Sequence, residues 1–369
     1  MKYFYNLFIY YIIFNCLFIN GLKIYNISLE TKPRDRWVAI VNDYKDEIIN
    51  LIKKTSKVIL PVIFPSSSLE LDSKVNDNVH FNLIELLIFS KLPFRYREEI
   101  YGIAHHLNTT VGEILILNIF YDLIASENMN KLIPFVSSSI ILHDNKTFIY
   151  HGYKINYLFK DLIKNMTFIV NFYQNGNILF TSHHYGGFIG IVNGVKINKF
   201  TISLNSRCKG NYLDNIKFIL YHQFNSIPLT IRATLEFENT FEDAMLVLSE
   251  TPYVAPASIT ITGTKCQQGI IVTTDRYKTL SIRYINETID NFILSNEEEN
   301  SSQTKIILSE INYQMMNHST KQNFGYILDR ILKNNYTFNY NSSNIFQTIM
   351  STNFPSYIYN YSRFIRQDD

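Results

Sequence analysis

The spacing of apolar residues changes from helical to strand-like at Ser139 of this chain of 369 residues, and that change limits the folds open to it. Between residues 33 and 136 apolar side chains recur at helical spacing, as in the run from Trp37 to Ile52. A further helix is expected from Thr110, whose hydroxyl can cap it while Glu113 closes a capping box. From Ser139 onward apolar and polar residues alternate, which is typical of half-buried strands.

The second part of the chain predicts strands, then helices, then strands again. Asn175-Gly176 and Asn193-Gly194 are strong hairpin signals, and Asp144-Asn145 is a further turn. Helices are expected over 213–224, 228–237 and 241–251. Strands are expected over 139–143, 147–153, 168–173, 178–182, 188–192, 199–204, 258–262, 269–274 and 280–285. This order predicts an α+β protein whose helices cover a largely antiparallel sheet or pair of sheets.

The first 21 residues have the pattern of a secretory signal peptide. Lys2 supplies the positive start, Phe4 to Phe18 is mostly apolar, and Asn20-Gly21 offers a small residue for cleavage. The alternative is a retained membrane anchor, which Asn6 and Asn15 disfavour because they interrupt the apolar run. We therefore expect entry into the secretory pathway, ending in the lysosomal lumen or outside the cell.

Glycosylation sequons and cysteines fit the same compartment. Cys16 would leave with the signal, while Cys208 and Cys266 could pair under oxidising conditions. Two cysteines do not make a disulfide scaffold, so the fold must rest on its own core. Asn-x-Ser/Thr sequons, several of which we expect to carry glycan, lie at Asn26, Asn108, Asn145, Asn165, Asn286, Asn300, Asn317, Asn335, Asn341 and Asn360.

Common motifs for catalysis, phosphate binding and metal binding are missing from the chain. There is no phosphate-binding glycine loop, GxSxG elbow, paired-cysteine or HExxH signature. His183-His184 make a poor metal pair, since adjacent strand residues point to opposite faces. A triad of Ser137, His151 and Asp144 is possible, but a chain rich in serine offers many such triples. We expect no metal and no cofactor, and a net charge of +2 gives no reason to expect nucleic acid.

Short blocks between about Trp37 and Ile285 occur in a specific order and spacing. They are Asn118-Ile-Phe-Tyr-Asp-Leu123, Ser137-Ser-Ser-Ile-Ile141, Ile149-Tyr-His-Gly152, Gly187-Phe-Ile-Gly-Ile-Val-Asn-Gly194, Phe200-Thr-Ile-Ser-Leu-Asn-Ser-Arg207, Ala255-Pro256 and Val272-Thr-Thr-Asp-Arg276. In these blocks the chain resembles the acid ceramidase and N-acylethanolamine acid amidase family. The resemblance implies an N-terminal-nucleophile hydrolase fold, a four-layer αββα sandwich. It divides the chain into a signal peptide (1–21), a helical segment (22–136) and a hydrolase-like domain (137–369).

The resemblance also implies where a catalytic site should lie. In the family, self-cleavage exposes a cysteine whose free α-amine acts as base while its thiolate attacks the amide of an N-acyl lipid. An arginine and an aspartate hold the nucleophile's amine and carbonyl, and a glutamate and an asparagine complete the site. These family positions, in the order cysteine, arginine, aspartate, glutamate and asparagine, are here Ser137, Tyr153, Asn156, Ser206 and Thr264. Arg207 and Arg276 are retained, and residues 124 to 132 are additional to the family pattern.

Two functions of different class follow from these replacements. The first is a catalytically silent relative that keeps the fold and binds an N-acyl lipid or another amphiphile, with peripheral membrane contact. The second is an active amidase that uses Ser137, and a hydrolase with a rearranged site is a further alternative. Loss of one oxyanion or positioning group costs about 10²–10³ in rate, so several losses favour the silent relative.

The resemblance has a consequence for the two remaining cysteines. In the family the positions of Ser206 and Thr264 face one pocket, and Cys208 and Cys266 each lie two residues further along. The two thiols are therefore expected either to bridge across that pocket or to remain as buried free cysteines.

Overall fold

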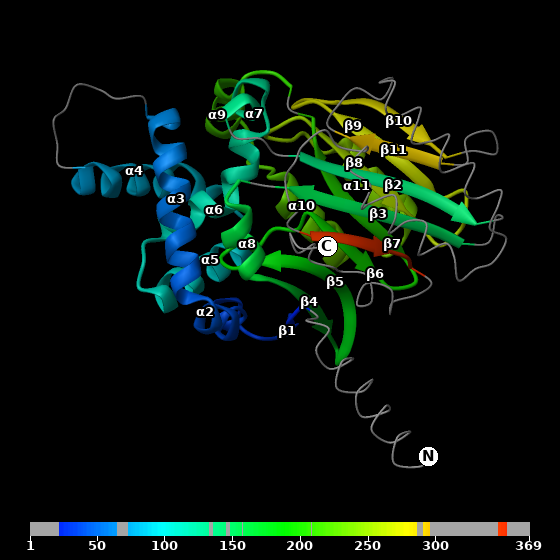
Figure 1. Ribbon diagram of the computed structural model, residues 1–369, viewed down its shortest axis with the longest axis horizontal. Helices are drawn as coiled ribbons and strands as arrows, with labels where there is room; N and C mark the ends of the chain where they lie inside the picture. Colours follow the sequence, from blue (N-terminus) through cyan, green and yellow to red (C-terminus); the bar gives the residue numbers. More distant parts are fainter. Residues whose placement is uncertain are drawn as a thin grey trace, which may run out of the picture.

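The computed structural model describes residues 22–64, 73–132, 136–144, 148–156, 158–207, 209–285, 291–295 and 346–352. Two β-sheets face each other, with helices gathered at one end and on one outer face (Figure 1). The larger sheet has the strand order β1-β4-β5-β6-β7-β8-β9-β10 and the smaller one β11-β2-β3-β12. The mixed α and β character predicted from the sequence is confirmed.

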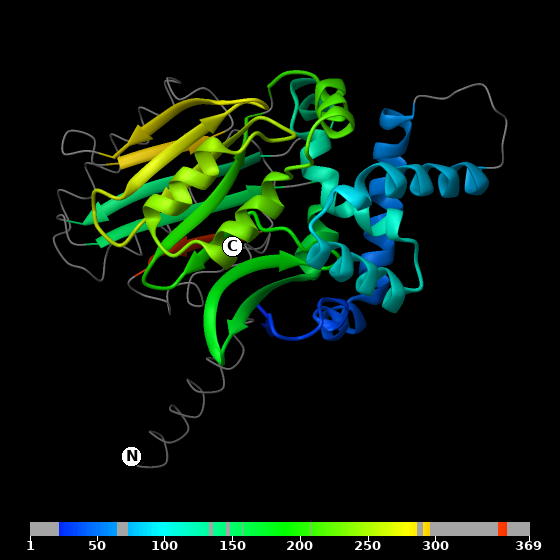
Figure 2. The ribbon, with the colours of Figure 1, turned by 180° about the vertical axis from the view of Figure 1, so that it is seen from behind.

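The eight-stranded sheet is antiparallel except at its first pair. Its strands are β1 (Ile24–Ser28), β4 (Thr167–Gln174), β5 (Asn177–Tyr185), β6 (Asn193–Lys196), β7 (Phe200–Ser206), β8 (Ala257–Thr262), β9 (Gly269–Thr274) and β10 (Thr279–Tyr284). The helices α10 (Ile227–Phe237) and α11 (Phe241–Glu250) cover its outer face, as Figure 2 shows from behind. Because both faces are covered, nearly every side chain of β7, β8 and β9 is buried.

The four-stranded sheet packs on the other face of the larger sheet. It consists of β2 (Val136–Asp144), β3 (Phe148–Asn156), β11 (Asn291–Ser295) and β12 (Phe346–Met350), all paired antiparallel. The closest approach between the two sheets is between β2 and β7. Two sheets beneath a helical layer account for three layers of the predicted sandwich within the described residues.

The helical segment begins at Pro33 and runs to the start of β2, as its apolar spacing predicts. It contains α2 (Val38–Asp43), α3 (Lys45–Ile63), α4 (Ser73–Ile88), α5 (Phe94–Leu107), α6 (Val111–Ile124) and α7 (Glu127–Leu132), with single 3-10 turns at Pro33–Asp35 and Phe89–Lys91. The predicted capping box at Thr110 and Glu113 is present at the start of α6. No helix of the described part of the chain is long and apolar enough to cross a membrane.

The start of the chain differs from the sequence prediction. Ile24–Ser28 forms β1, which pairs in parallel with β4 and buries Tyr25 and Ile27. A strand of five residues with two buried side chains is too short for its period to be recognised in the sequence. The helical segment is thus joined to the sandwich through the larger sheet itself.

The other predicted strands and helices after Ser139 are present except at one place, and the predicted turn at Asp144-Asn145 lies partly outside the described residues. The turn at Asn175-Gly176 is confirmed, with both residues at positive φ. A strand over 188–192 is wrong, because this stretch is irregular and Asn193-Gly194 opens β6 instead of forming a turn. Gly187 explains the difference, since its φ of 82° turns the chain toward Leu117 and Ile48 of the helical segment.

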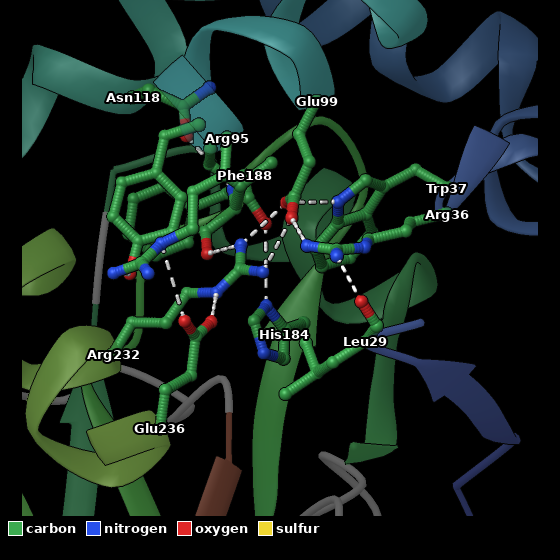
Figure 3. A network of polar contacts seen from close by, with 12 residues as sticks. Leu29, Arg36, Trp37, Arg95, Glu99, Asn118, His184, Phe188, Arg232 and Glu236 are labelled. Carbon is green, nitrogen blue, oxygen red and sulfur yellow. Dashed lines mark hydrogen bonds and ion pairs between the residues drawn. The ribbon is translucent and has the colours of Figure 1, made fainter. Parts of the chain in front are cut away.

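A buried ion cluster fastens the helical segment to α10. Glu99 of α5 is fully buried and bonds both Arg232 of α10, at 2.6 Å, and Arg36, at 2.8 Å. Trp37 donates its indole N–H to the same carboxylate, and Glu236 binds the other side of Arg232 (Figure 3). Burial opposes the charge on Glu99, but the arginines and the indole outweigh it and lower its pKa. Arg232 of the sandwich therefore supplies part of the positive charge that keeps Glu99 ionised.

Two short helices complete the fold. The first is α8 (Lys160–Asn165), which precedes β4, and the second is α9 (Tyr212–Tyr221), which follows β7. α9 packs against both α6 and α7, at the end of the sandwich where β2 begins. This end of the molecule holds the predicted nucleophile position.

Candidate active site

Ser137 lies one residue inside β2 and faces the larger sheet. It pairs with Ile155 of β3, and only 1% of its surface is exposed. Strand alternation puts Ser137 and Ser139 on the same face of β2, opposite β7. The residue is therefore enclosed between the two sheets, with its backbone held in the ladder of the smaller one.

Tyr153 occupies the position of the family arginine and bonds directly to Ser137. Its hydroxyl donates to the Leu204 carbonyl oxygen at 2.9 Å, so its hydrogen bond with Ser137 is one in which the serine donates. Burial raises the pKa of Tyr153 far above its ordinary value, against the smaller effect of that bond. A neutral phenol whose proton is already committed cannot remove the proton of Ser137.

Asn205 is the second partner of Ser137. Its Nδ2 donates to Ser137 Oγ at 3.3 Å, and its Oδ1 accepts a hydrogen bond of 2.5 Å from Ser139 Oγ. The bond from Ser139 fixes which end of the amide faces Ser137. The serine hydroxyl thus accepts from one neutral group and donates to another.

These contacts continue as a chain of buried hydrogen bonds between the sheets. Ser139 Oγ lies 2.6 Å from Ser203 Oγ, which lies 2.7 Å from Nε2 of His151. Nδ1 of His151 contacts Thr201 Oγ1 at 2.7 Å, and Thr201 contacts Thr262 at 2.6 Å. One set of proton positions satisfies every bond, with each hydroxyl donating once in the direction from Thr262 to Tyr153.

His151 is consequently a neutral structural group. Burial lowers its pKa to about 3, and the chain of bonds places its proton on Nε2. The structure does not bring His151 to Ser137, because Asn205, Ser139 and Ser203 stand between them. An amide cannot pass a proton along, so the triad of Ser137, His151 and Asp144 has no route for proton transfer.

The two retained arginines hold backbone and amide groups at the same end of the sheets. Arg207 donates to the Thr274 carbonyl oxygen at 2.9 Å, and burial lowers its pKa. Arg276 donates to Asn215 Oδ1 at 2.9 Å and to the Asn211 carbonyl oxygen at 3.1 Å. Their contacts fasten α9 and β9 near the end of β7, which makes them positioning groups for this end of the fold.

Thr264 is not brought to this site. Along the pair of β7 and β8, Ser206 lies opposite Ala257 while Thr201 lies opposite Thr262. The turn that holds Thr264 is therefore beyond the other end of the strands, more than about 17 Å from Ser206 at ~3.4 Å per residue. Thr264 donates its backbone N–H to Gln268 Oε1 at 3.0 Å and stabilises that turn.

The same separation bears on the cysteines. Cys266 is free and half-buried in the turn with Thr264. Cys208 lies outside the described residues, and because Cys266 is free the structure holds no bridge between the two thiols. The premise that positions 206 and 264 face one pocket is wrong here, because they are at opposite ends of a strand pair.

Ser206 and Asn156 end the two strands next to the nucleophile position. Ser206 is buried at the end of β7 and follows Asn205, so strand alternation directs it to the face away from Ser137. Asn156 ends β3 with its backbone opposite Val136, and its side chain lies outside the described residues. The residue that sequence reasoning missed is Asn205. The polar alternation of Thr201, Ser203 and Asn205 was the available signal.

The residues additional to the family pattern form a short helix beside the site. They include α7, which packs on α9, and the Glu127 N–H donates to the Gly210 carbonyl oxygen at 2.9 Å. Among the described residues there is no group of three or more metal-ligating side chains. What the site presents is thus a serine in a neutral, closed set of hydrogen bonds.

Comparison with known proteins agrees with this architecture. A family model described as the beta subunit of N-acylethanolamine-hydrolyzing acid amidase matches residues 21–69. A solved Caenorhabditis elegans N-acylethanolamine-hydrolyzing acid amidase ortholog superposes with a TM-score of 0.55 and 21% identity. The superposition covers 62% of this chain and 100% of the solved chain. The fold is therefore that of the N-terminal-nucleophile hydrolases, as the resemblance implied.

Sequence relatives define the family more narrowly. N-acylethanolamine-hydrolyzing acid amidase of Rattus norvegicus is 30% identical over 69% of this chain and 64% of its own length. The Caenorhabditis elegans amidase is 26% identical over 73% of this chain and 72% of its own length. Acid ceramidase of Heterocephalus glaber is 28% identical over 70% of this chain and 65% of its own length. These matches make the chain similar to members of the acid ceramidase and N-acylethanolamine acid amidase family.

Proposed function

We propose that this chain is a family member in which amide hydrolysis is lost or very slow, and which acts by binding an N-acyl lipid or another amphiphile. The observation that carries the proposal is the bonding of Ser137. Its hydroxyl donates to the neutral Tyr153 and accepts from the amide of Asn205. In the family the base is the nucleophile's own α-amine, which stays in a peptide bond unless the chain is cut before Ser137, and neither hydrogen-bond partner can act as a base in its place.

The charges that support the family mechanism are absent from the positions that should carry them. Tyr153 replaces an arginine, and Asn156 and Ser206 replace carboxylates. Arg207 and Arg276 are engaged with Thr274 and Asn215. Such losses do not add simply, yet each positioning or oxyanion group alone is worth about 10²–10³ in rate.

One observation favours the alternative, an active amidase that uses Ser137. The Nδ2 of Asn205 points at the serine oxygen, where a donor could stabilise an oxyanion. Serine does serve as an N-terminal nucleophile, but only after the peptide bond before it is cut. Self-cleavage therefore separates the two functions.

Intact mass spectrometry of the purified secreted protein tests this proposal. We expect one polypeptide that continues through Val136 and Ser137, because the groups that would drive self-cleavage are replaced. A matched Ser137→Ala variant should show the same pattern of masses. Two fragments that meet between Val136 and Ser137, present in the wild type and absent in Ser137→Ala, would establish the amidase instead.

The compartment belongs to the same proposal. We infer entry into the secretory pathway and residence in the lysosomal lumen or outside the cell, from the first 21 residues and the sequons. Peripheral membrane contact would fall to apolar residues such as Leu86 and Leu87 of α4, which are exposed.

Glycosylation gives this inference a direct test. Asn108 and Asn165 are exposed, at the ends of α5 and α8, and both begin sequons. Protein expressed in eukaryotic cells should migrate faster on a gel after glycosidase treatment, and the double change Asn108→Gln and Asn165→Gln should reduce that shift. An unshifted wild-type band, or a cytosolic location, would refute the secretory assignment.

A further inference from the structure

Asp122 lies where the helical segment meets two helices of the sandwich. It belongs to the last turn of α6 and is fully buried. Its Oδ1 accepts the backbone N–H of Ile227, the first residue of α10, at 3.2 Å. Its carbonyl oxygen accepts Nδ2 of Asn215, from α9, at 2.7 Å. A single residue thus joins α6 to both α9 and α10.

The other carboxyl oxygen has no hydrogen bond of normal geometry. Oδ2 of Asp122 and the hydroxyl of Ser226, the residue before Ile227, are both buried without such a bond, and the hydroxyl acts on the carboxylate more weakly than burial does. An ionised carboxylate with one buried, unpaired oxygen is costly. A protonated carboxyl loses that cost, because its charge is gone and Oδ2 becomes a hydrogen-bond donor.

The charged groups on the surrounding elements make their contacts elsewhere. On α9, Asp214 and Lys217 pair with each other at 3.7 Å. The guanidinium of Arg276 binds Asn215, and that of Arg232 binds Glu99 and Glu236. On α6 itself, Glu113 is engaged at the opposite end of the helix. Glu127 lies on α7 and Asp275 beside Arg276, while the side chain of Lys131 on α7 lies outside the described residues. None of these contacts supplies Asp122 with a positive charge.

We propose that Asp122 is a proton-binding joint, which strengthens the attachment of α6 to α10 when the surroundings turn acidic. Burial raises the pKa of Asp122 to about 7, against the smaller effects of Ser226 and the Ile227 amide. An unfolded aspartate titrates near 3.9. Between these two pKa values the folded chain binds a proton that the unfolded chain lacks. The contribution of Asp122 to the folding constant therefore increases as pH falls, by at most about tenfold per pH unit.

Other buried groups act in the opposite direction. His151, His183 and His184 are neutral, with the pKa of each lowered to about 3 by burial. Unfolding lets them take up protons below about pH 6.5, so their contribution destabilises the fold in acid. The pH dependence of the stability of the whole chain therefore combines both effects, and Asp122 offsets part of the stability that the histidines lose in acid. The difference between wild type and a variant isolates its contribution.

Chemical denaturation of the full-length secreted protein at pH 7.5 and 5.5 tests the joint. Asp122→Asn imitates the protonated form and cannot titrate. We expect the folding constant of wild type, relative to Asp122→Asn, to rise about twentyfold between these two pH values. The control is Asp214→Asn, which removes an exposed carboxylate on the neighbouring helix. Its folding constant relative to wild type should be the same at both pH values. If the ratio of the wild-type folding constant to that of Asp122→Asn changed by less than twofold between the two pH values, the proposal would be overturned.

A second measurement serves if Asp122→Asn does not fold. Wild-type protein labelled with carboxyl-¹³C aspartate can be titrated by NMR without any substitution. We expect one aspartate resonance to move with a midpoint near pH 7. If every aspartate titrates below pH 5, Asp122 is ionised at neutral pH and the joint does not bind a proton.

Discussion

Ser137→Cys alone is expected to leave hydrolysis of N-acyl amides no faster than Ser137→Ala. A thiol is the better nucleophile, but at this position it would still face the neutral Tyr153 and the amide of Asn205. Its α-amine would stay in a peptide bond, because the arginine and aspartate that serve self-cleavage in the family are missing. Nucleophile identity is thus not the limiting defect.

Restoring the surrounding charges should matter more. The triple change Ser137→Cys, Tyr153→Arg and Asn156→Asp returns a cation and a carboxylate to the nucleophile together. We expect it to exceed Ser137→Cys by about 10²–10³ in turnover of an N-acyl amide, and to cut itself before residue 137. The control carries Tyr153→Arg and Asn156→Asp with Ser137→Ala and should be silent. Equal turnover by the single and the triple variant would mean that the charges are not what is missing.

Glu99→Gln should unfold the protein more readily than almost any other isosteric change. The substitution leaves Arg232 fully buried with Glu236 as its remaining carboxylate partner. It also removes the carboxylate partner of Arg36, which keeps the carbonyl oxygens of Thr31 and Leu29 (Figure 3). Breaking a buried ion pair by removing one partner costs about 3–5 kcal/mol. Urea denaturation followed by tryptophan fluorescence measures the loss, since Trp37 donates to this carboxylate.

The matched control is the neighbouring glutamate. Glu98 of the same helix pairs with Arg34 at the surface, where half of the arginine side chain is exposed. Exposed ion pairs contribute about 0–1 kcal/mol, so Glu98→Gln should remain near wild type. If Glu99→Gln were as stable as Glu98→Gln, the cluster would not fasten the helical segment to the sandwich.

The sequence predicted the elements of this fold well because most of them have long, regular apolar periods. The capping box at Thr110 and the turn at Asn175-Gly176 are local patterns, and both are confirmed. β1 escaped prediction because its pairing with β4 is a contact across more than a hundred residues. The strand expected over 188–192 failed because helical residues approach Gly187 closely, a tertiary effect without a local signal.

The structure brings together some of the site residues that the resemblance implied and places others elsewhere. Ser137 and Tyr153 are in contact, as the resemblance implied for their positions. The resemblance points to Ser206, while strand alternation turns its neighbour Asn205 toward Ser137. Thr264 was grouped with the site by family position, whereas the register of β7 and β8 carries it to the far end of the sheet. The order of motifs along the chain does not predict which residues of two strands lie opposite each other.

The most direct test of the account is turnover of an N-acyl amide by purified wild-type protein beside Ser137→Ala. Both N-acylethanolamine and ceramide substrates should be supplied, at acidic and at neutral pH. The account predicts equal signals from the two proteins, because the α-amine of Ser137 stays in a peptide bond and the neutral partners of its hydroxyl cannot accept the proton instead. Turnover by the wild type that disappears in Ser137→Ala would contradict it and make the chain a serine amidase.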